Sequence, residues 1–414
     1  MTHDPDVAII GAGAAGIAAA RRLAGSGLSA VVLEALPRIG GRAWTRTAAG
    51  MPLDLGCGWL HSADRNPWTR RAEEAGFAVD RRTPAWRTQY HDLGFPPAEQ
   101  QEADRAFTEW IRQLAAAPPA SDTAAHALEP GGRWTSYLQA MSGFISGDEL
   151  ERVSARDFTA YDTASTGRNW RLPAGYGTLV TASLPAEAEL HPATPVQAIT
   201  LDGRCVALRT PAGTVRARAA ILTVSTSVLT GGAMALPAAL DPWREAAARL
   251  PLGCNEKLFL EIVGDSPFEP ETHVLGDPHD ATTGSYYIRP FGWPVIECFL
   301  GGAGARAMAA SGPDAAFARA IDQLVNLFGA TVRRCLRPLV ASHWTNTATI
   351  GGAYSHALPG QADARAALAL PFDGRLFFAG EATHATDFST AHGAYASGLR
   401  AADEAIRELR TCAR

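Results

Sequence analysis

Short apolar runs separated by a helical pattern open the chain. Residues 7–10 are apolar and run directly into a glycine-rich loop, which predicts a buried parallel strand. Residues 14–23 are rich in alanine and stop shortly before Gly25, as expected for a helix with a glycine exit. Residues 30–34 form a second apolar run that ends in an acid. Together these patterns predict one strand–helix–strand unit.

The rest of the chain alternates between helical and strand patterns without an internal repeat. A three-stranded antiparallel meander is predicted between residues 196 and 215, because apolar runs there alternate with Asp-Gly and Ala-Gly turns. Two helical stretches are expected between residues 80 and 130, where prolines mark the breaks. Further helices are predicted over residues 67–76, 317–328 and from about 393 onward. Further buried strands are predicted over residues 220–224, 258–262, 295–300 and 376–379.

A glycine-rich loop follows the first predicted strand and carries the first candidate chemistry. Gly11 permits a tight turn, Gly13 lets the backbone approach a pyrophosphate, and Gly16 allows close packing of helix on strand. The free N–H groups of the helix N-terminus would then face the phosphates. Glu34, at the end of the next strand, is placed to accept ribose hydroxyls, which disfavours NADP. A glycine-rich turn without a ligand is the alternative, and the strand–loop–helix context favours the dinucleotide.

The segment after Glu34 narrows the choice of dinucleotide. Gly40 and Gly41 would bring the backbone close to the pyrophosphate, and Arg42 offers a guanidinium fork for its oxygens. A Gly-Gly-Arg stretch just beyond the ribose acid resembles an extension of the two-dinucleotide-binding flavoprotein superfamily. That resemblance implies FAD as the cofactor. Taken alone, Arg42 could instead be a surface arginine.

Four later blocks resemble the flavin amine oxidases, and particularly their polyamine-oxidase-like members. Together with the N-terminal unit they run from residue 7 to about 403 in the family's order, whereas residues 80–170 match no part of that pattern. The resemblance implies an α/β fold, with a two-dinucleotide-binding (Rossmann-like) FAD domain and an interleaved α+β substrate domain. The blocks are DLGCGWLH at 54–61, LGCNEKLFL at 252–260, WTN with GGAYS between 344 and 355, and FFAGEAT with TAHGAYASG between 377 and 398.

Chain length and the order of these patterns indicate two interleaved domains. The 414 residues exceed what one ordinary core needs. We expect a discontinuous FAD-binding domain made of residues 1–80, 190–250 and 372–414. The substrate domain would then comprise residues 81–189 and 251–371.

The resemblance assigns the catalytic role to Lys257. In the family the matching lysine holds a water against flavin N5, and a desolvated, readily shifted ammonium suits that task and the reoxidation of flavin by oxygen. From spacing alone, a strand-edge lysine that reaches solvent is the alternative. Tyr354 and Trp344 are aromatic candidates beside the flavin, and His61 matches a histidine that lines the substrate tunnel of polyamine oxidases. For each of these three the alternative is packing in the core.

The C-terminal blocks supply the remaining cofactor candidates. Glu381 follows a buried strand and a glycine, at the end of the sheet where α/β folds bind cofactors, and the resemblance places it near the ribityl–pyrophosphate part of the flavin. Thr390 and Ala391 precede the last helix, whose N–H groups would face the N1–C2=O edge of the flavin ring. The side chain of His392 is interpreted as packed. The residues expected to bind the cofactor are Gly11, Gly13, Ala15, Gly16, Glu34, Gly40, Gly41, Arg42, Gly58, Trp59, Val196, Trp344, Gly380, Glu381, Thr390 and Ala391, and those expected to bind substrate are His61 and Tyr354.

Departures from the family pattern refine these expectations. Ala353 occupies the position where monoamine oxidases attach their flavin through a cysteine, so FAD should be non-covalent here. Thr390 stands near the position of their second cage tyrosine. Trp59 replaces the carboxylate-binding arginine of L-amino-acid oxidases, which makes a free α-amino acid a less favoured substrate.

The resemblance implies that a neutral amine passes hydride from its C–H bond to flavin N5, giving an imine and then an aldehyde or ketone. Oxygen would take the electrons as H2O2. Asp157 and Asp162, in the unmatched region, could bind a distal ammonium, although surface or capping positions are favoured for both. An FAD oxidase or desaturase acting on a non-amine carbon skeleton is the first alternative, and a flavin-bound protein without catalysis is the second.

Composition narrows the setting of this chemistry. A net charge of -5 gives the surface no general attraction for nucleic acid or anionic membranes. The six cysteines form no CxxC pair, so no metal site is expected and a reducing, cytoplasmic setting is favoured. The N-terminus lacks the basic segment of a signal peptide, and no stretch approaches a membrane span. The expected partners are a small-molecule amine and O2, in a monomer or homodimer.

Overall fold

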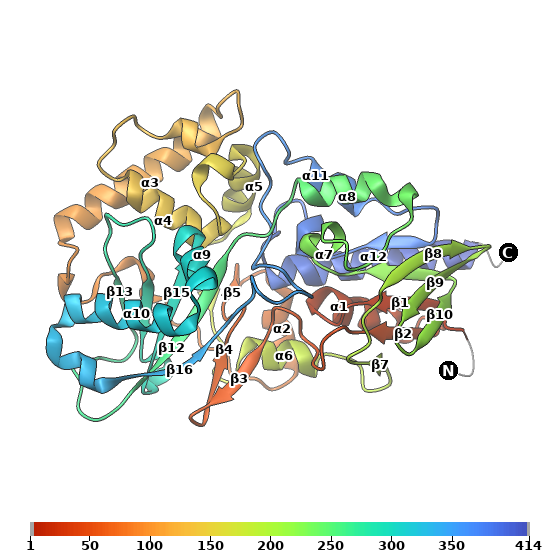
Figure 1. The fold of residues 1–414 in the computed structure, drawn as a ribbon, viewed down its shortest axis with the longest axis horizontal. Helices are drawn as coiled ribbons and strands as arrows, with labels where there is room; N and C mark the ends of the chain where they lie inside the picture. Colours follow the sequence, from red (N-terminus) through yellow and green to blue (C-terminus); the bar gives the residue numbers. More distant parts are fainter. Residues whose placement is uncertain (1–3, 412–414) are drawn as a thin grey trace.

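In the computed structural model, which describes residues 4–411, five parallel strands form the first sheet (Figure 1). The predicted strand–helix–strand unit is confirmed. The helix α1 (Ala14–Leu23) connects the strands β1 (Val7–Ile10) and β2 (Ala30–Leu33), which pair with each other in parallel. The sheet is assembled from the start, middle and end of the chain. In spatial order its strands are β17 (Leu376–Phe378), β11 (Ala219–Leu222), β1 (Val7–Ile10), β2 (Ala30–Leu33) and β7 (Glu189–His191).

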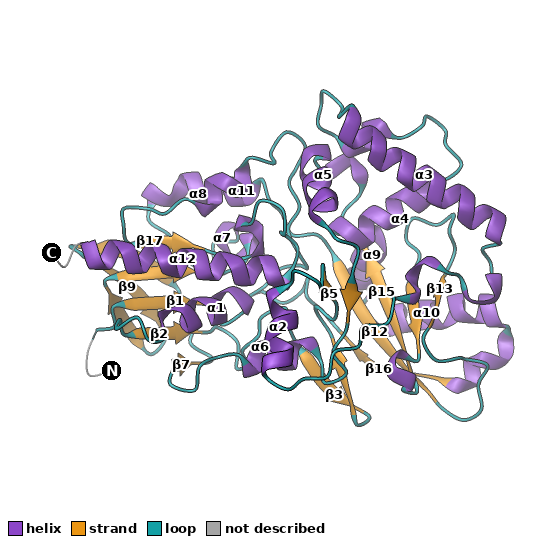
Figure 2. Ribbon diagram, turned by 180° about the vertical axis from the view of Figure 1, so that it is seen from behind, coloured by secondary structure: helices purple, strands orange, loops and turns teal. Residues whose placement is uncertain are grey.

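Both faces of this parallel sheet are covered, which is why its strands are apolar throughout. Val7 and Ile9 point toward α1 and the long C-terminal helix α12 (Ala391–Thr411), which lie against one another in Figure 2. Ala8 and Ile10 face the predicted meander, which forms a three-stranded antiparallel sheet. This second face is covered by β8 (Ala198–Asp202), β9 (Cys205–Thr210), β10 (Gly213–Ala217), α7 (Thr226–Thr230), α8 (Asp241–Ala248) and α11 (Ala364–Ala369).

A five-stranded antiparallel sheet forms the other half of the molecule. The two strands predicted over 258–262 and 295–300 are confirmed and pair directly with each other. The first begins three residues earlier than expected, so Lys257 lies inside the strand, opposite Phe299. The helices α9 (Gly302–Ser311) and α10 (Pro313–Phe328) cover one face. In spatial order the strands are β13 (Thr272–Leu275), β14 (Ser285–Ile288), β15 (Val295–Gly301), β12 (Asn255–Ile262) and β16 (Leu336–Ala341).

Three helices pack beside this sheet and come from the segment that matched no family pattern (Figure 1). They are α3 (Pro97–Ala116), α4 (Thr135–Ser146) and α5 (Ala155–Ala164). The expectation of helical stretches between residues 80 and 130 is met by α3 and by short 3-10 helices on either side of it, one of which spans Ala124–Ala127. The flanking residues form short 3-10 turns, and the positive φ angles of His91 and Asp92 interrupt any longer helix there.

Small elements connect the two halves. They are two two-stranded sheets, β3 with β4 and β5 with β6, and two short helices. The exact division of the chain into an FAD-binding and a substrate domain stays a prediction. The connecting elements are β3 (Thr45–Ala48), β4 (Met51–Asp54), β5 (Leu60–His61), β6 (Asn169–Trp170), α2 (Pro67–Glu74) and α6 (Tyr176–Ala182).

Candidate active site

One cavity of about 930 Å³ is lined by residues from both halves of the molecule. Its wall includes the glycine-rich loop after β1, the Gly-Gly-Arg segment, strand β12 and the inner faces of α3, α4 and α5. The structure brings all the predicted site residues to this cavity except Gly16, which lies beneath the loop. The residues predicted to hold a dinucleotide and the inner faces of these three helices therefore line one continuous cavity, the chamber being its part beside the helices.

The glycine-rich loop has the backbone geometry that the sequence predicts. Gly11 has a φ of +105°, which a residue with a side chain adopts at a cost. A Cβ on Gly16 would lie 1.9 Å from the carbonyl oxygen of Gly11, so the helix can pack this closely only on glycine. Gly13 and Ala15 line the cavity at the start of α1, where free N–H groups suit an anion.

Glu34 fixes this loop as well as facing the cavity. Its carboxylate accepts hydrogen bonds from the backbone N–H groups of Ala12, at 2.7 Å, and Leu36, at 2.8 Å. Each carboxylate oxygen keeps a further lone pair for a ribose hydroxyl. The Gly-Gly-Arg segment lies alongside, and a Cβ on Gly41 would be 3.2 Å from the Cα of Gly13. The cradle thus fits a dinucleotide because glycine occupies each position of close approach.

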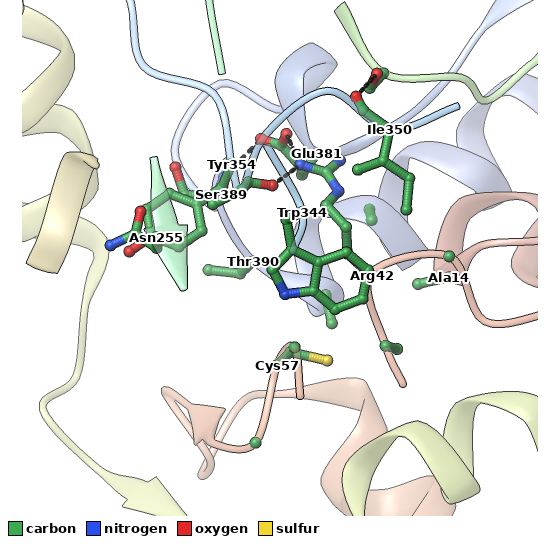
Figure 3. Close-up of a pocket in the computed structure, with 18 of the residues that line it drawn as sticks. Ala14, Arg42, Cys57, Asn255, Trp344, Ile350, Tyr354, Glu381, Ser389 and Thr390 are labelled. Carbon is green, nitrogen blue, oxygen red and sulfur yellow. Dashed lines mark hydrogen bonds and ion pairs between the residues drawn. The ribbon is translucent and has the colours of Figure 1, made fainter. Parts of the chain in front are cut away.

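Arg42 and Glu381 form an ion pair at the cavity wall (Figure 3). The guanidinium of Arg42 lies 3.1 Å from the carboxylate and also donates to the carbonyl oxygen of Ala353. The same carboxylate accepts from the hydroxyl of Ser355 at 2.7 Å and from the backbone N–H of Ser389 at 2.9 Å. Glu381 therefore joins three segments of the chain beside the cavity.

The charge of Glu381 is stabilised by this network. Burial alone would raise its pKa, but the nearby charges of Arg42 and Arg365 and the hydrogen bond from Ser355 outweigh burial, so the pKa lies below its usual value. The group is ionised at neutral pH. Its charge holds Arg42 at the wall, where the guanidinium can still offer N–H groups to a phosphate oxygen.

Lys257 projects from β12 into the cavity wall. Its Nζ lies 2.8 Å from a carboxylate oxygen of Glu297 and donates to the carbonyl oxygen of Asp54 at 3.1 Å. Only 8% of the side chain is exposed, so the alternative of a solvent-reaching lysine is wrong. A Cβ on Gly58 would come within 3.2 Å of Nζ, so a side chain there would press on the ammonium.

Tryptophan and tyrosine side chains are held by hydrogen bonds around the cavity. The indole of Trp344 donates to the carbonyl oxygen of Leu55 at 2.9 Å, and the hydroxyl of Tyr354 donates to the carbonyl oxygen of Phe144. Figure 3 shows Trp344, Tyr354 and Glu381 around the same pocket. Both rings line the cavity, so each can pack in the protein interior and also contact a bound ligand.

Trp59 and His61 lie on another part of the wall. Trp59 packs edge-on against Trp86 at 4.3 Å between ring centroids, and the guanidinium of Arg171 lies 4.8 Å from its centroid. Nδ1 of His61 contacts the side-chain oxygen of Asn169 at 2.6 Å. Burial lowers the pKa of His61 to about 4, so the ring is neutral at neutral pH.

The start of α12 is built by Thr390. Its hydroxyl accepts from the backbone N–H of Gly393 at 3.0 Å and donates to the carbonyl oxygen of Asp387. Thr390 and Ala391 both line the cavity. The imidazole of His392 is buried, with Nδ1 3.3 Å from the side-chain nitrogen of Asn66, which agrees with its interpretation as a packed side chain. Gly380 and Val196, from loops after β17 and before β8, complete the predicted set at the wall.

The sequence did not identify the residues that shape the chamber. Their signal is weak because the helices have apolar inner faces typical of any packed helix. The preference for a surface or capping position is wrong for Asp157 and is not contradicted for the partly exposed Asp162. Asp157 is buried in an ion pair with Arg365, and Asp162 lines the cavity. Apolar and aromatic residues of this chamber are Trp86, Phe95, Phe107, Ile111, Tyr137, Met141, Phe144, Ile145, Tyr161, Leu275, Tyr287 and Phe299.

A Rossmann-like sheet joined by one cavity to a lysine-bearing aromatic chamber is the arrangement expected of a dinucleotide-dependent oxidoreductase. The chain matches the model of the flavin containing amine oxidoreductase family over residues 85–406, and a Rossmann-like NAD(P)-binding model over residues 9–74. The chain belongs to the flavin-containing amine oxidase family. Family membership implies FAD, and the predicted fold class is confirmed.

Two plant polyamine oxidases match nearly the whole chain, and a third relative matches part of it. Polyamine oxidase 2 of Arabidopsis thaliana is 27% identical, over 97% of this chain and 88% of the relative. Polyamine oxidase 1 of Oryza sativa subsp. japonica is 28% identical, over 99% and 98%. Pseudooxynicotine dehydrogenase of a Pseudomonas species is 26% identical over 63% and 60%. A solved double mutant of putrescine oxidase, redesigned in its cofactor binding, shares the fold with a TM-score of 0.77 at 19% identity, over 97% and 99%.

Within residues 4–411, no helix combines the length and the apolar character that crossing a bilayer requires.

Proposed function

We propose that this protein is an FAD-dependent amine oxidase that releases H2O2. The observation that carries the proposal is the place of Lys257, whose ammonium lies in the wall of the one cavity that the nucleotide cradle and the aromatic chamber share. When bound there, FAD would accept a hydride from an amine C–H bond and deliver the electrons to O2. The chain's own residues bind and orient the amine, exclude water and hold a charged donor at the wall.

The cofactor is proposed to be non-covalent. Ala353 lines the cavity and has no atom that can form a thioether. Cys57 also lines the cavity, but burial and the nearby Asp54 carboxylate raise the pKa of its thiol to about 12. A thiol that stays protonated is a poor nucleophile. Acid precipitation should therefore release all flavin into the supernatant, and yellow precipitated protein would contradict this part of the proposal.

The chamber favours an amine with an apolar body. Its wall is mostly aromatic and aliphatic, and the neutral ring of His61 adds no positive charge that would repel an amine. Such walls exclude water and stabilise an apolar substituent by burial. Asp162 is half-buried there, and burial raises its pKa. Its carboxyl has no hydrogen-bond or ion-pair partner among the side chains that the structure describes. It is the proposed contact for a second ammonium group.

A panel of monoamines, diamines, polyamines and amino acids tests this proposal. We expect peroxide release with amines that carry an apolar substituent, and a Asp162→Asn variant should raise KM for diamines more than for monoamines. If peroxide is released with a non-amine compound whose carbon skeleton can be desaturated, and with none of the amines, the oxidase or desaturase alternative is favoured. A flavoprotein that releases no peroxide with any of these compounds would favour the non-catalytic alternative.

A further inference from the structure

Glu297 lies in the cavity wall next to the only lysine in the sequence. It projects from β15, which pairs with β12 so that Lys257 lies opposite Phe299 and Glu297 lies opposite Phe259. Residues offset by two positions on paired strands share one face of the sheet and can touch diagonally. The carboxylate and the ammonium meet at 2.8 Å, with 20% and 8% of the two side chains exposed.

Each group of this pair has few other contacts. Nζ of Lys257 donates to the carbonyl oxygen of Asp54 at 3.1 Å. Among the side chains that the structure describes, the carboxylate of Glu297 has no other hydrogen bond or ion pair. An ammonium carries three N–H donors, so two fixed contacts leave one donor for the cavity. The pair therefore fixes the direction in which the remaining N–H can point.

We infer that Glu297 is a positioning residue, which holds the ammonium of Lys257 in its charged form and in one orientation at the cavity wall. This inference rests on the proposed function and deepens it by naming the group that prepares the lysine. A largely buried ammonium without a counter-ion tends to lose its proton, and a carboxylate in contact reverses that tendency. Without Glu297, the ammonium would hold its proton less tightly and could swing on its flexible stem.

The other ionisable groups near the ammonium do not supply this counter-ion. The carboxylate of Asp54, whose pKa is raised by burial, accepts from the hydroxyl of Thr45 and from two backbone N–H groups of α6. Burial holds the thiol of Cys57 protonated and the ring of His61 neutral at neutral pH. Glu297 is thus the carboxylate in direct contact.

The neighbouring strands contribute two further titratable groups to the same cavity. Tyr287 of β14 donates its hydroxyl to Glu271, and burial raises the pKa of this phenol. His273 of β13 contacts the hydroxyl of Ser285 at 2.8 Å, and burial lowers the pKa of this ring to about 4. Both groups are neutral near pH 7, so neither replaces the charge of Glu297.

Because the chain has one lysine, the protonation of Lys257 can be measured directly. Selective labelling of lysine with ¹³C at Cε gives one side-chain NMR signal, whose shift can be followed against pH in the holoenzyme. A Glu297→Gln variant should lower the titration midpoint by about 1–3 pH units, the usual effect of losing an opposite charge in contact. The matched control is Asp162→Asn, which removes another carboxyl of the same cavity without touching Lys257 and should leave the midpoint in place.

Stopped-flow reoxidation of reduced enzyme supplies a second readout. In Glu297→Gln, the alkaline limb of the reoxidation rate should move to lower pH by the same interval as the NMR midpoint. A Glu297→Asp variant keeps the charge on a shorter stem, so it should keep most of the midpoint while reoxidation still slows. That separation distinguishes orientation from charge.

An unchanged midpoint in Glu297→Gln, or an equal fall in Asp162→Asn, would overturn the inference. The NMR titration needs no amine, so its result is independent of the proposed function. If the midpoint falls but no amine reduces the flavin, the pairing stands and the amine oxidase proposal fails.

Discussion

The chemical behaviour of each charged residue at this site depends on the groups that the fold places in contact with it. Lys257 could be singled out from the sequence because the segment around it resembles a family block, but its partner Glu297 could not. The two are 40 positions apart, and only the register of two antiparallel strands brings them together. In the same way Arg42 could be placed near a phosphate, whereas its contact with Glu381 depends on how three distant segments meet. Sequence identifies chemical groups here, and the fold decides their neighbours.

Replacing Lys257 with methionine should keep the cofactor and slow the chemistry. The thioether is of similar length and apolar, so it fits the buried site without the charge. Stopped-flow measurement should show yellow protein whose slower half-reaction, reduction or reoxidation, falls by about 10²-fold, as for loss of one preorganised donor. A Lys257→Arg variant is the control for charge alone, because its planar fork cannot reproduce the contact with Asp54. Wild-type rates for both half-reactions in the methionine variant would exclude a catalytic role for Lys257.

Four of the five strands of the Rossmann-like sheet could be predicted closely, because strands buried on both faces are apolar runs. The edge strand β7 could not, because two of its three residues are polar and none is buried. The helices α3, α4 and α5 could not be related to the site. Their inner faces converge on a cavity, which in sequence has the same pattern as a packed core. Buried charged residues are the second reason why these helices could not be placed from the sequence. Asp157 of α5 appears hydrophilic in sequence, yet its carboxylate accepts from Nε of Arg365 at 2.6 Å and from the backbone N–H of Ala357 at 2.8 Å.

This ion pair ties α5 to α11, and 3% of each side chain is exposed. A Asp157→Asn substitution leaves the guanidinium of Arg365 buried without its counter-charge, which should lower the free energy of unfolding by about 3–5 kcal/mol. Chemical denaturation of the holoenzyme measures the loss. The matched control is Arg156→Ala, which breaks an exposed pair with Asp363 and should cost about 1 kcal/mol or less. Equal losses in the two variants would show that the buried pair does not brace the helix.

At the scale of the whole molecule, two sheets share one cavity, and ionisable groups in its wall are held in fixed charge states. The resemblance could predict the overall architecture from blocks spread along the chain. It could not predict which side chains the two halves present to each other, since the chamber is built from segments that the resemblance does not cover. The neutral rings of His61 and His273 belong to this shared wall.

These histidines should make stability depend on pH. Burial lowers the pKa of His273 from 6.5 to about 4, so below pH 6.5 the unfolded chain binds a proton that the folded protein does not. The free energy of unfolding should therefore fall as pH drops from 6.5 to 5, by about 1.4 kcal/mol per pH unit for such a group. A His273→Gln variant should show a shallower slope in this window and a parallel curve between pH 7 and 8. An unchanged slope would show that the ring is protonated in the folded state.

The most direct test of the central claim is anaerobic mixing of the purified holoenzyme with the amine panel while the visible absorbance of oxidised flavin is followed. An amine oxidase should bleach fully with at least one amine, and admission of O2 should restore the absorbance with release of H2O2. Flavin that stays oxidised with every amine, yet is reduced by dithionite, would contradict the account.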